Sequence, residues 1–238
     1  MPPSRQTAPS FAARAILTEL MDEPSSYEEF RDCLRDLEAV NRTVLAYRPT
    51  LRWLRQFSAP ELHILDVGFG GGDMLRRIEE WARSRLLTVQ LTGIDLNPYA
   101  KRAAREFTIP SSRIQWVTSD AFSYRPAHPV DIIISSLFTH HLSDADIVRF
   151  LQWMEQTAVR GWFINDLSRG RVSYVLFKLL ARLMRWHRFV QHDGPVSIQR
   201  SFTAEDWRRY IAEAGLAHLS IQIFSARPGR LCVSRVKR

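Results

Sequence analysis

The sequence predicts an α/β protein built on a doubly wound, mainly parallel sheet. Short apolar runs alternate with helical patterns of ten or more residues along most of the chain, which is typical of parallel strands joined by helices. The first apolar run ends in a cluster of glycines. The 238 residues are 45% hydrophobic and 24% charged, a globular composition that argues against a disordered, collagenous or repeat protein.

The chain begins with a predicted tail and helical cap. Residues 1–10 carry three prolines and are expected to form an irregular tail. Residues 11–55 show apolar residues at three- and four-residue spacing, which predicts helices. We therefore divide the chain into an N-terminal tail and cap, residues 1–57, and a main domain, residues 58–238.

The alternation of strands and helices runs through the middle of the chain. The predicted strands are residues 62–67, 87–94, 114–118, 131–135 and 161–165, and the predicted helices are residues 73–85, 98–107 and 143–158.

The last part of the chain has a different character. One long helix is expected over residues 171–189, followed by an irregular stretch, H-D-G-P-V-S; together they form a helical insert or lid, residues 168–202. Thr203 followed by Asp206 has the form of a capping box and predicts a helix start. Two runs, residues 218–225 and 230–236, flank A-R-P-G and predict an antiparallel hairpin at the sheet edge.

Charge and cysteine content limit the class of protein. The net charge of +8 favours contact with nucleic acid, but acidic residues are interspersed everywhere except between Asp166 and Asp193, so no nucleic-acid partner is expected. Cys33 and Cys232 lie far apart without metal-ligand spacing and predict reduced thiols. Without an apolar signal-peptide core or membrane-length segment, we expect a soluble, cytoplasmic protein.

The most informative motif is I-L-D-V-G-F-G-G-G-D, residues 64–73. Gly68, Gly70 and Gly72 suit a strand-to-helix turn where the backbone takes positive φ or approaches a ligand closely. Asp73 stands where the dinucleotide fingerprint GxGxxG needs a glycine, which weighs against NAD(P). Asp66, at the strand end, suits a ligand with a positive amino group rather than a pyrophosphate.

This D-x-G-x-G-x-G pattern resembles the first motif of class I S-adenosylmethionine-dependent methyltransferases. The resemblance extends over residues 62–236 and implies a Rossmann-like, seven-stranded sheet, an enzyme, and S-adenosylmethionine as its cofactor. The flanking segments E-L-M-D, V-N-R and H-D-G-P-V-S-I-Q-R-S-F resemble bacterial small-molecule methyltransferases of polyketide, phenolic-lipid or quinone-type biosynthesis.

The resemblance also implies which residues hold the cofactor. Asp95, in G-I-D-L-N-P, corresponds to the acid that accepts both ribose hydroxyls. Asp120 corresponds to the side chain against the adenine amino group, with the backbone N–H of Ala121 or Phe122 beside it. The expected cofactor-binding residues are Asp66, Gly68, Phe69, Gly70, Asp95, Leu96, Asp120, Ala121 and Ser135.

Three histidines are candidates for a general base, since imidazole titrates near neutral pH. His140 and His141 follow the predicted fourth strand, at the edge where open α/β sheets bind ligands, and His192 lies in the insert. Helix capping or packing are the alternatives for each of them. Asp166, Asp193 and Glu19 are further candidates for this role.

Missing motifs narrow the acceptor. The chain has S-S-L-F where enzymes that methylate amino groups of nucleic acids carry Asp/Asn-Pro-Pro-aromatic, and it lacks the Pro-Cys of cytosine C5 enzymes. Ser135 and Ser136 stand where a catechol-type metal site would place an Asp, so no metal is expected. We expect a small, hydrophobic aromatic acceptor methylated on a phenol or quinol-like oxygen.

Several alternatives stay open. These are methylation of carbon or nitrogen, a cofactor-binding subunit without catalysis, and an RNA-associated methyltransferase. The helix over residues 171–189 carries Arg171, Lys178, Arg182 and Arg185 near one face, so it predicts either a lid on the core or a transient contact with a membrane surface. The oligomeric state is not predicted.

Overall fold

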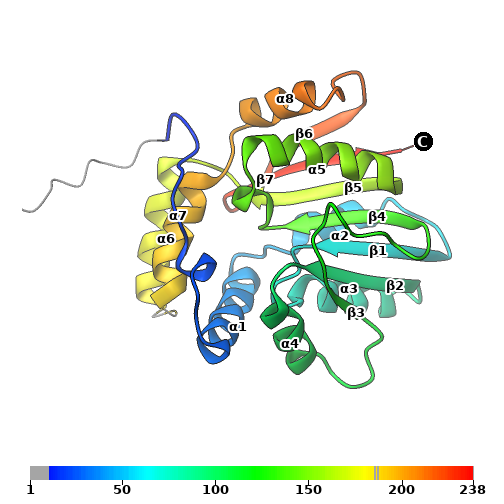
Figure 1. Cartoon of the computed structure of the whole chain (residues 1–238), viewed down its shortest axis with the longest axis horizontal. Coiled ribbons are helices and arrows are strands. Elements are labelled where there is room, and N and C mark those ends of the chain that lie inside the picture. Colours follow the sequence, from blue (N-terminus) through cyan, green and yellow to red (C-terminus); the bar gives the residue numbers. More distant parts are fainter. Residues whose placement is uncertain (1–10, 185, 187, 238) are drawn as a thin grey trace, which may run out of the picture.

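The computed structural model describes residues 11–184, 186 and 188–237 and shows a seven-stranded sheet flanked by helices (Figure 1). The strand order is β3-β2-β1-β4-β5-β7-β6. The first five strands are parallel, and β7 lies antiparallel between β5 and β6. The predicted doubly wound α/β class and the terminal hairpin are confirmed.

Each predicted strand is present, with ends that shift by up to three residues. The strands are β1 (Glu61–Val67), β2 (Thr88–Asp95), β3 (Gln115–Thr118), β4 (Val130–Ser136), β5 (Ala158–Leu167), β6 (Ile221–Ala226) and β7 (Arg230–Val236).

The helices connect these strands or extend the N-terminus. The α-helices are α1 (Tyr27–Thr43), α2 (Arg48–Leu54), α3 (Asp73–Arg83), α4 (Pro98–Phe107), α5 (Asp144–Thr157), α6 (Arg171–Leu183), α7 (Arg188–Arg200) and α8 (Ala204–Glu213), and short 3₁₀ helices cover Leu20–Asp22 and Thr139–His141.

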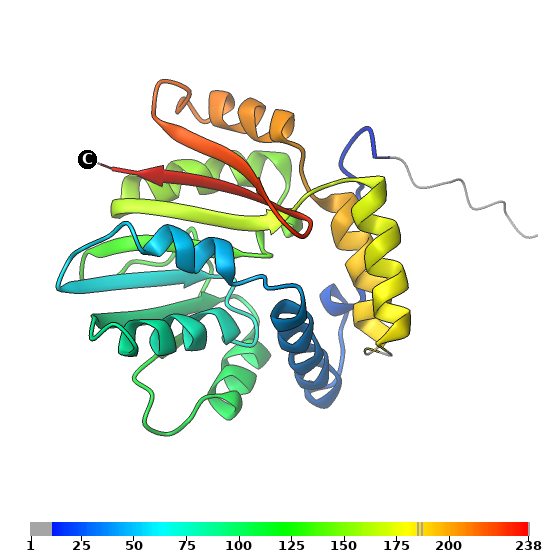
Figure 2. The same cartoon turned by 180° about the vertical axis from the view of Figure 1, so that it is seen from behind.

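Two hydrophobic cores cover the two faces of the sheet. Side chains alternate between faces along a strand, so in β1 Ile64 packs toward α2 and α3 while Leu65 packs toward α5 and α8. Figures 1 and 2 show α5 and α8 on one face and α2 and α3 on the other. The capping box of Thr203 and Asp206 at the start of α8 is present, as predicted.

A third layer stands at the carboxyl ends of the parallel strands. There α1, α6 and α7 form a wall beyond the ends of β1, β4 and β5 (Figure 2). Helix α1 joins this wall to the sheet, because its Phe30 belongs to the core over α3 whereas its Cys33 packs with Phe189 of α7. Cys33 and Cys232 are both free and buried.

The prediction of one helix over residues 171–189 is wrong, and so is the irregular stretch after it. Helix α6 ends at Leu183, and the H-D-G-P-V-S residues lie inside α7, Pro195 included. Gly194 explains this, because a Cβ there would come within 1.9 Å of the Phe177 ring. The close packing of α6 on α7 therefore outweighs the low helix propensity of the Gly-Pro pair.

The N-terminal region is less helical than predicted. Residues 11–19 form no helix, and α1 begins after Ser26, whose hydroxyl caps the N–H of Glu29. The irregular segment is fixed by side-chain contacts, since Arg14 donates hydrogen bonds to the carbonyls of His140 and Arg200. Within the described residues no helix combines the length and apolar composition that crossing a membrane requires.

Candidate active site

A cavity of about 510 Å³ lies between the carboxyl ends of the parallel strands and the wall of α1, α6 and α7. Its floor comes from the glycine loop after β1, from Asp95 at the end of β2, and from the turn after β4. Its walls are largely apolar, with Phe30, Leu34, Leu37, Phe177, Leu180 and Ile198 among the lining residues.

The glycine loop has the backbone that the sequence predicted. Gly68, Gly70 and Gly72 have φ values of 74°, 52° and 76°, in the left-handed region that favours glycine. At Gly68 a Cβ would lie 2.5 Å from the Phe138 ring, so this position has no room for a side chain. The loop exposes backbone to the cavity next to the start of α3, where polar or anionic groups bind favourably.

Asp95 closes the loop from the neighbouring strand. Its Oδ2 accepts a hydrogen bond from Gly70 N at 3.0 Å, and its Oδ1 accepts one from Asn97 N at 2.9 Å. Burial raises the pKa of Asp95 despite these two hydrogen bonds, which lower it. The carboxyl lines the cavity and each oxygen keeps acceptor capacity for a hydroxyl pair.

Asp66 lies behind the glycine loop. It is 2% exposed, and its Oδ1 has no hydrogen-bond partner among the described residues. Burial raises its pKa well above the usual range, with Asp73 and Asp95 adding to the shift. A buried carboxyl without a full set of partners is costly, and a nearby ammonium group would relieve that cost.

The other expected cofactor residues lie less directly on the cavity. Leu96 is 73% exposed, and the Asp120 carboxyl accepts a hydrogen bond from Ser123 N. The hydroxyl of buried Ser135 donates to the carbonyl of Val67 at 3.0 Å. These three residues, Ala121 and Asp66 are absent from the described lining of the cavity, whereas Phe69 contributes to it.

The turn after β4 places two histidines at the cavity. Leu137 has φ 56°, an uncommon value for a side-chain-bearing residue, and its N–H donates to the carbonyl of Asn165. His140 follows, buried at 3% exposure, with Nδ1 2.8 Å from Oδ1 of Asp166. Sequence reasoning had proposed both residues separately, and the structure pairs them.

Asp166 is fully buried and well supplied with donors. Its carboxyl also accepts hydrogen bonds from the Thr139 hydroxyl, from His140 N and from Leu167 N. Burial alone would raise its pKa, but the charge of His140 and these hydrogen bonds hold the pKa below its usual range. The contact with Asp166 fixes the orientation of the His140 ring through Nδ1, and Nε2 lies on the side of Glu19, 3.7 Å from its Oε1.

A second carboxylate group reaches the same place from the N-terminal segment. Glu19, 3% exposed, has its Oε1 3.7 Å from Nε2 of His140 and its Oε2 3.8 Å from Nε2 of His141. Burial raises the pKa of Glu19, and the charges of His141 and Arg200 oppose that shift. Asp22 holds His141 from the other side, with Oδ1 3.3 Å from Nδ1.

His192 does not join this group. Its side chain is 50% exposed, its Nδ1 lies 2.8 Å from Oδ1 of Asp193, and it is absent from the described cavity lining. Asp193 uses its carboxyl to accept hydrogen bonds from the backbone of Leu20 and Met21, which fixes the segment that carries Glu19.

Arg230 is a site residue that the sequence did not reveal. It begins β7, is 3% exposed and lines the cavity, and within the described part of the chain its Nη1 has no hydrogen-bond partner. Its Nη2 donates to Asn41, which in turn donates to Asp73 at the start of α3. Strand β7 runs antiparallel to β5, so Arg230 at the start of β7 lies beside the end of β5. The predicted hairpin was the only feature of the sequence that pointed to this position.

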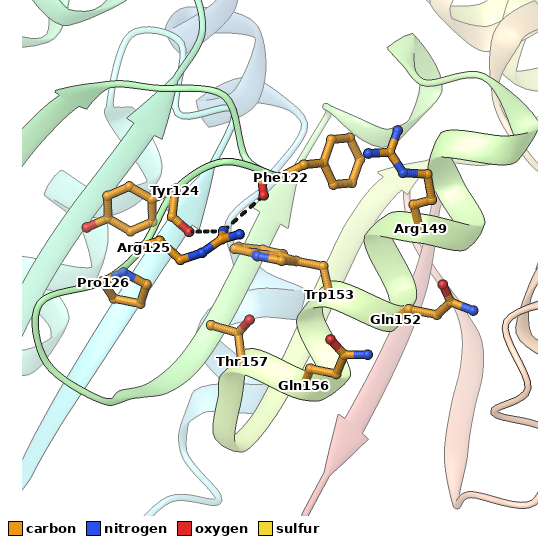
Figure 3. A pocket seen from close by; sticks show the side chains of 9 residues that line it. All are labelled: Phe122, Tyr124, Arg125, Pro126, Arg149, Gln152, Trp153, Gln156 and Thr157. Atoms are coloured by element: carbon orange, nitrogen blue, oxygen red, sulfur yellow. Dashed lines mark hydrogen bonds between the residues drawn. The ribbon is translucent and has the colours of Figure 1, made fainter.

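A second hollow lies away from this cavity, between α5 and the loop after β3 (Figure 3). Its floor is Trp153, and Arg125 donates hydrogen bonds to the carbonyls of Phe122 and Tyr124 at its rim. It shares no described lining residue with the first cavity. The candidate site is therefore the first cavity, which contains the glycine loop, His140 and His141.

Comparison with known proteins gives the class. Residues 64–161 match the family model described as a methyltransferase domain. The match begins in β1 and ends in β5, so it includes the glycine loop, Asp95 and the turn with His140. The chain therefore contains a methyltransferase domain, with the fold of the class I enzymes that use S-adenosylmethionine, as the sequence predicted.

The chain is similar to trans-aconitate 2-methyltransferase of Streptomyces avermitilis, with 29% identity over 128 residues. The alignment covers 52% of this chain and 46% of the relative, so the chain spans about half the length of that protein.

Solved structures share the fold at low sequence identity. The plantazolicin methyltransferase BpumL in complex with S-adenosylhomocysteine (SAH) has a TM-score of 0.63 at 15% identity, covering 88% of this chain and 96% of that chain. Magnesium protoporphyrin IX methyltransferase from Synechocystis PCC 6803 with bound SAH has a TM-score of 0.54 at 15% identity, covering 91% and 90%. Human N-acetylserotonin methyltransferase with S-adenosylmethionine gives 0.58 at 16% identity, covering 89% and 56%. These complexes agree with the predicted cofactor.

Proposed function

We propose that the protein transfers a methyl group from S-adenosylmethionine to a hydroxyl of a small apolar aromatic acceptor, a phenol or quinol-like ring. One observation carries the proposal: a single cavity joins the glycine loop and Asp95 to the His140–Asp166 pair, under apolar walls. A cofactor crevice that opens on a buried histidine–carboxylate pair suits methylation of an oxygen that must first lose its proton.

The residues of the crevice fit the proposed cofactor. Asp95 would accept the ribose hydroxyls, and the raised pKa of the orphaned Asp66 carboxyl suits a site that receives an ammonium group. Arg230, whose buried Nη1 has no partner in the described structure, would bind the carboxylate of the amino-acid end of the cofactor. Asp120, Ala121, Leu96 and Ser135 stay predicted contacts of the adenosine and the methyl donor.

His140 handles the proton of the acceptor. Bound S-adenosylmethionine supplies a sulfonium-linked methyl group, whose transfer to oxygen leaves a methyl ether and SAH. In this mechanism His140 Nε2 takes the hydroxyl proton. Asp166 orients the His140 ring through Nδ1 and stabilises the imidazolium that forms. His141 and Glu19 stand beside it, and His192 lies too far out for this role.

The apolar wall supports the acceptor class. Phe30, Leu37, Phe177 and Leu180 would contact a ring or an alkyl chain, and each such contact removes apolar surface from water. The name of the Streptomyces relative suggests a polycarboxylate acceptor instead. Such an acceptor would face this wall with charges, so we favour the aromatic hydroxyl.

Product analysis tests the proposal. Purified protein is incubated with S-adenosylmethionine and matched panels of phenols, hydroquinones, amines, activated carbon acids and trans-aconitate, and the products are analysed by mass and by position of the methyl group. We expect methyl ethers of apolar phenols or quinols. Methylation confined to nitrogen, carbon or a carboxylate oxygen would overturn the assignment of a hydroxyl acceptor, and steeply salt-dependent retention on RNA would favour a nucleic-acid partner.

A further inference from the structure

One group of side chains that lines the cavity has the composition of a metal site. In the part of the chain that the structure describes, Glu19, His140 and His141 offer ligand atoms that all lie within 4.8 Å of one another. We propose that these three residues bind a divalent first-row transition metal ion, with Zn²⁺ as the best match to their donors.

The distances favour an ion over direct hydrogen bonds. Nε2 of His140 lies 3.7 Å from one Glu19 oxygen, and Nε2 of His141 lies 3.8 Å from the other, both too long for a hydrogen bond. Ligands about 2.0–2.2 Å from a common Zn²⁺ ion stand roughly 3.3–3.6 Å apart in tetrahedral geometry. The ligand atoms, all within 4.8 Å of one another, would therefore have to move closer together through side-chain rotations to surround an ion.

The outer hydrogen bonds have the arrangement that metal-binding histidines need. His140 faces Asp166 with Nδ1 at 2.8 Å, and His141 faces Asp22 with Nδ1 at 3.3 Å. A histidine that donates one ring N–H to a carboxylate presents its other nitrogen as a ligand, in a fixed orientation. Both rings therefore direct Nε2 toward Glu19.

The neighbouring charges leave one side of Glu19 available. Arg200 Nη1 lies 3.4 Å from Oε1 and 2.9 Å from Asp22 Oδ2, and the Ser197 hydroxyl donates to Oε1. Oε2 faces His141 instead. The ion would sit between the Glu19 carboxylate and the two Nε2 atoms, and its remaining positions would open on the cavity that these three residues line.

Donor type selects the metal. Two imidazoles with one carboxylate suit Zn²⁺ and its first-row neighbours, whereas Mg²⁺ and Ca²⁺ prefer oxygen ligands throughout. The sequence predicted no metal because serines replace the Asp of a catechol-type site, but the proposed ion uses other residues. An ion here would bind the acceptor oxygen and lower its pKa, so that the proton leaves to water and His140 acts as a ligand rather than a base.

The role in the reaction rests on the proposed function, whereas ion binding does not. Chelator-treated protein is titrated with Zn²⁺ by calorimetry and with Co²⁺ by visible absorption, in the absence of cofactor and acceptor. Wild type is compared with Glu19→Gln, which keeps the shape of the side chain, with His141→Ala, and with the exposed-histidine control His218→Ala. Circular dichroism verifies that each variant is folded.

We expect one equivalent of Zn²⁺ bound by wild type and by His218→Ala, and affinity at least about tenfold weaker in Glu19→Gln and His141→Ala. Folded wild type that binds no Zn²⁺, or variants that bind as tightly as wild type, would overturn the site. SAH binding by the same preparations separates the two proposals. SAH binding without Zn²⁺ binding contradicts the metal site alone, and Zn²⁺ binding without SAH binding supports the metal site while contradicting the proposed methyltransferase activity.

Discussion

Nδ1 of His140 lies 2.8 Å from Oδ1 of Asp166; both side chains are buried, and His140 lines the cavity. The contact joins the turn after β4 to the end of β5, so the ring is held by two neighbouring strands rather than by one loop. His140 is thereby oriented whether it acts as a base or as a metal ligand.

Replacing Asp166 tests this orientation. Asp166→Asn removes the charge that stabilises the N–H of His140, so we expect kcat to fall by roughly 10²–10⁴-fold, the usual contribution of a general base. The comparison uses kcat, KM and the pH profile of wild type and variant. Unchanged kcat with an unchanged pH profile would contradict the assigned positioning role.

Asp166 also makes a prediction about stability. The pKa of Asp166 is lower in the folded protein than in the unfolded chain. Its contribution to the free energy of unfolding is therefore fully present above the ordinary Asp pKa, and it is lost as the pH falls below about 4 toward the folded value. Urea unfolding followed from pH 7 to pH 3 should therefore show less acid sensitivity in Asp166→Asn than in wild type. Equal acid sensitivity would show that other groups dominate acid unfolding.

Asp66 should release a proton when a ligand with an ammonium group binds. Its raised pKa favours the neutral carboxyl in the free protein, and a nearby positive charge favours the carboxylate. Calorimetric titration with SAH in buffers of different ionisation enthalpy measures this release directly. We expect it to be smaller, and binding to be weaker, in Asp66→Asn; identical proton release in the two proteins would exclude Asp66 as the source.

A side chain at Gly70 should strain the backbone of the glycine loop. Its φ is 52°, and a Cβ would lie 3.5 Å from Leu34, a lining residue, so Gly70→Ala puts a methyl group beside the cavity. We expect a loss of about 1–2 kcal/mol in unfolding free energy from the backbone, together with weaker SAH binding. Gly170→Ala is the matched control, because Gly170 has extended backbone and no neighbour within 4 Å of a Cβ. Similar behaviour of both variants would refute the close-approach argument.

The exposed side of α6 has the composition of a surface that contacts lipid. Val172, Leu176, Leu179 and Leu183 are 60–78% exposed and recur at helical spacing. The cations Arg171, Lys178 and Arg182 flank this stripe, and Arg185, predicted with them, lies outside the described residues. An exposed apolar stripe beside cations matches an anionic lipid surface, so we predict a transient contact there.

Vesicle sedimentation checks this contact. We expect binding to anionic vesicles that weakens with salt and with Leu179→Gln/Leu183→Gln, while the exposed-residue control Ile109→Gln/Val159→Gln binds as wild type does. Equal binding by both double variants would contradict the assignment. A dimer that dissociates in Leu179→Gln/Leu183→Gln would instead show that a second copy covers the stripe.

Periodicity was sufficient for the sheet, since each strand carries its own apolar pattern and each connecting helix its own face. The glycine loop and Asp95 could also be predicted, because their chemistry is local to two strand ends. The break between α6 and α7 could not be predicted, because it depends on how closely Phe177 approaches Gly194, a contact between two helices.

The arrangement of the polar residues around His140 could be predicted only in part from the sequence. His140 and Asp166 were both candidates, but their pairing depends on the register of β4 beside β5. Glu19 reaches His140 from a segment without helical or strand periodicity, fixed by hydrogen bonds to Asp193. Arg230 enters because β7 inserts between β5 and β6, which no local pattern specifies.

Calorimetric titration with SAH tests the central claim most directly, because the account requires a cofactor crevice between the glycine loop and Asp95. Folded wild type and the surface control Glu28→Ala should bind one equivalent, and Asp95→Ala should bind at least about tenfold more weakly, since one charge-assisted contact contributes roughly 1.5–3 kcal/mol. Undetectable binding by folded wild type, or equal binding by Asp95→Ala, would contradict the account.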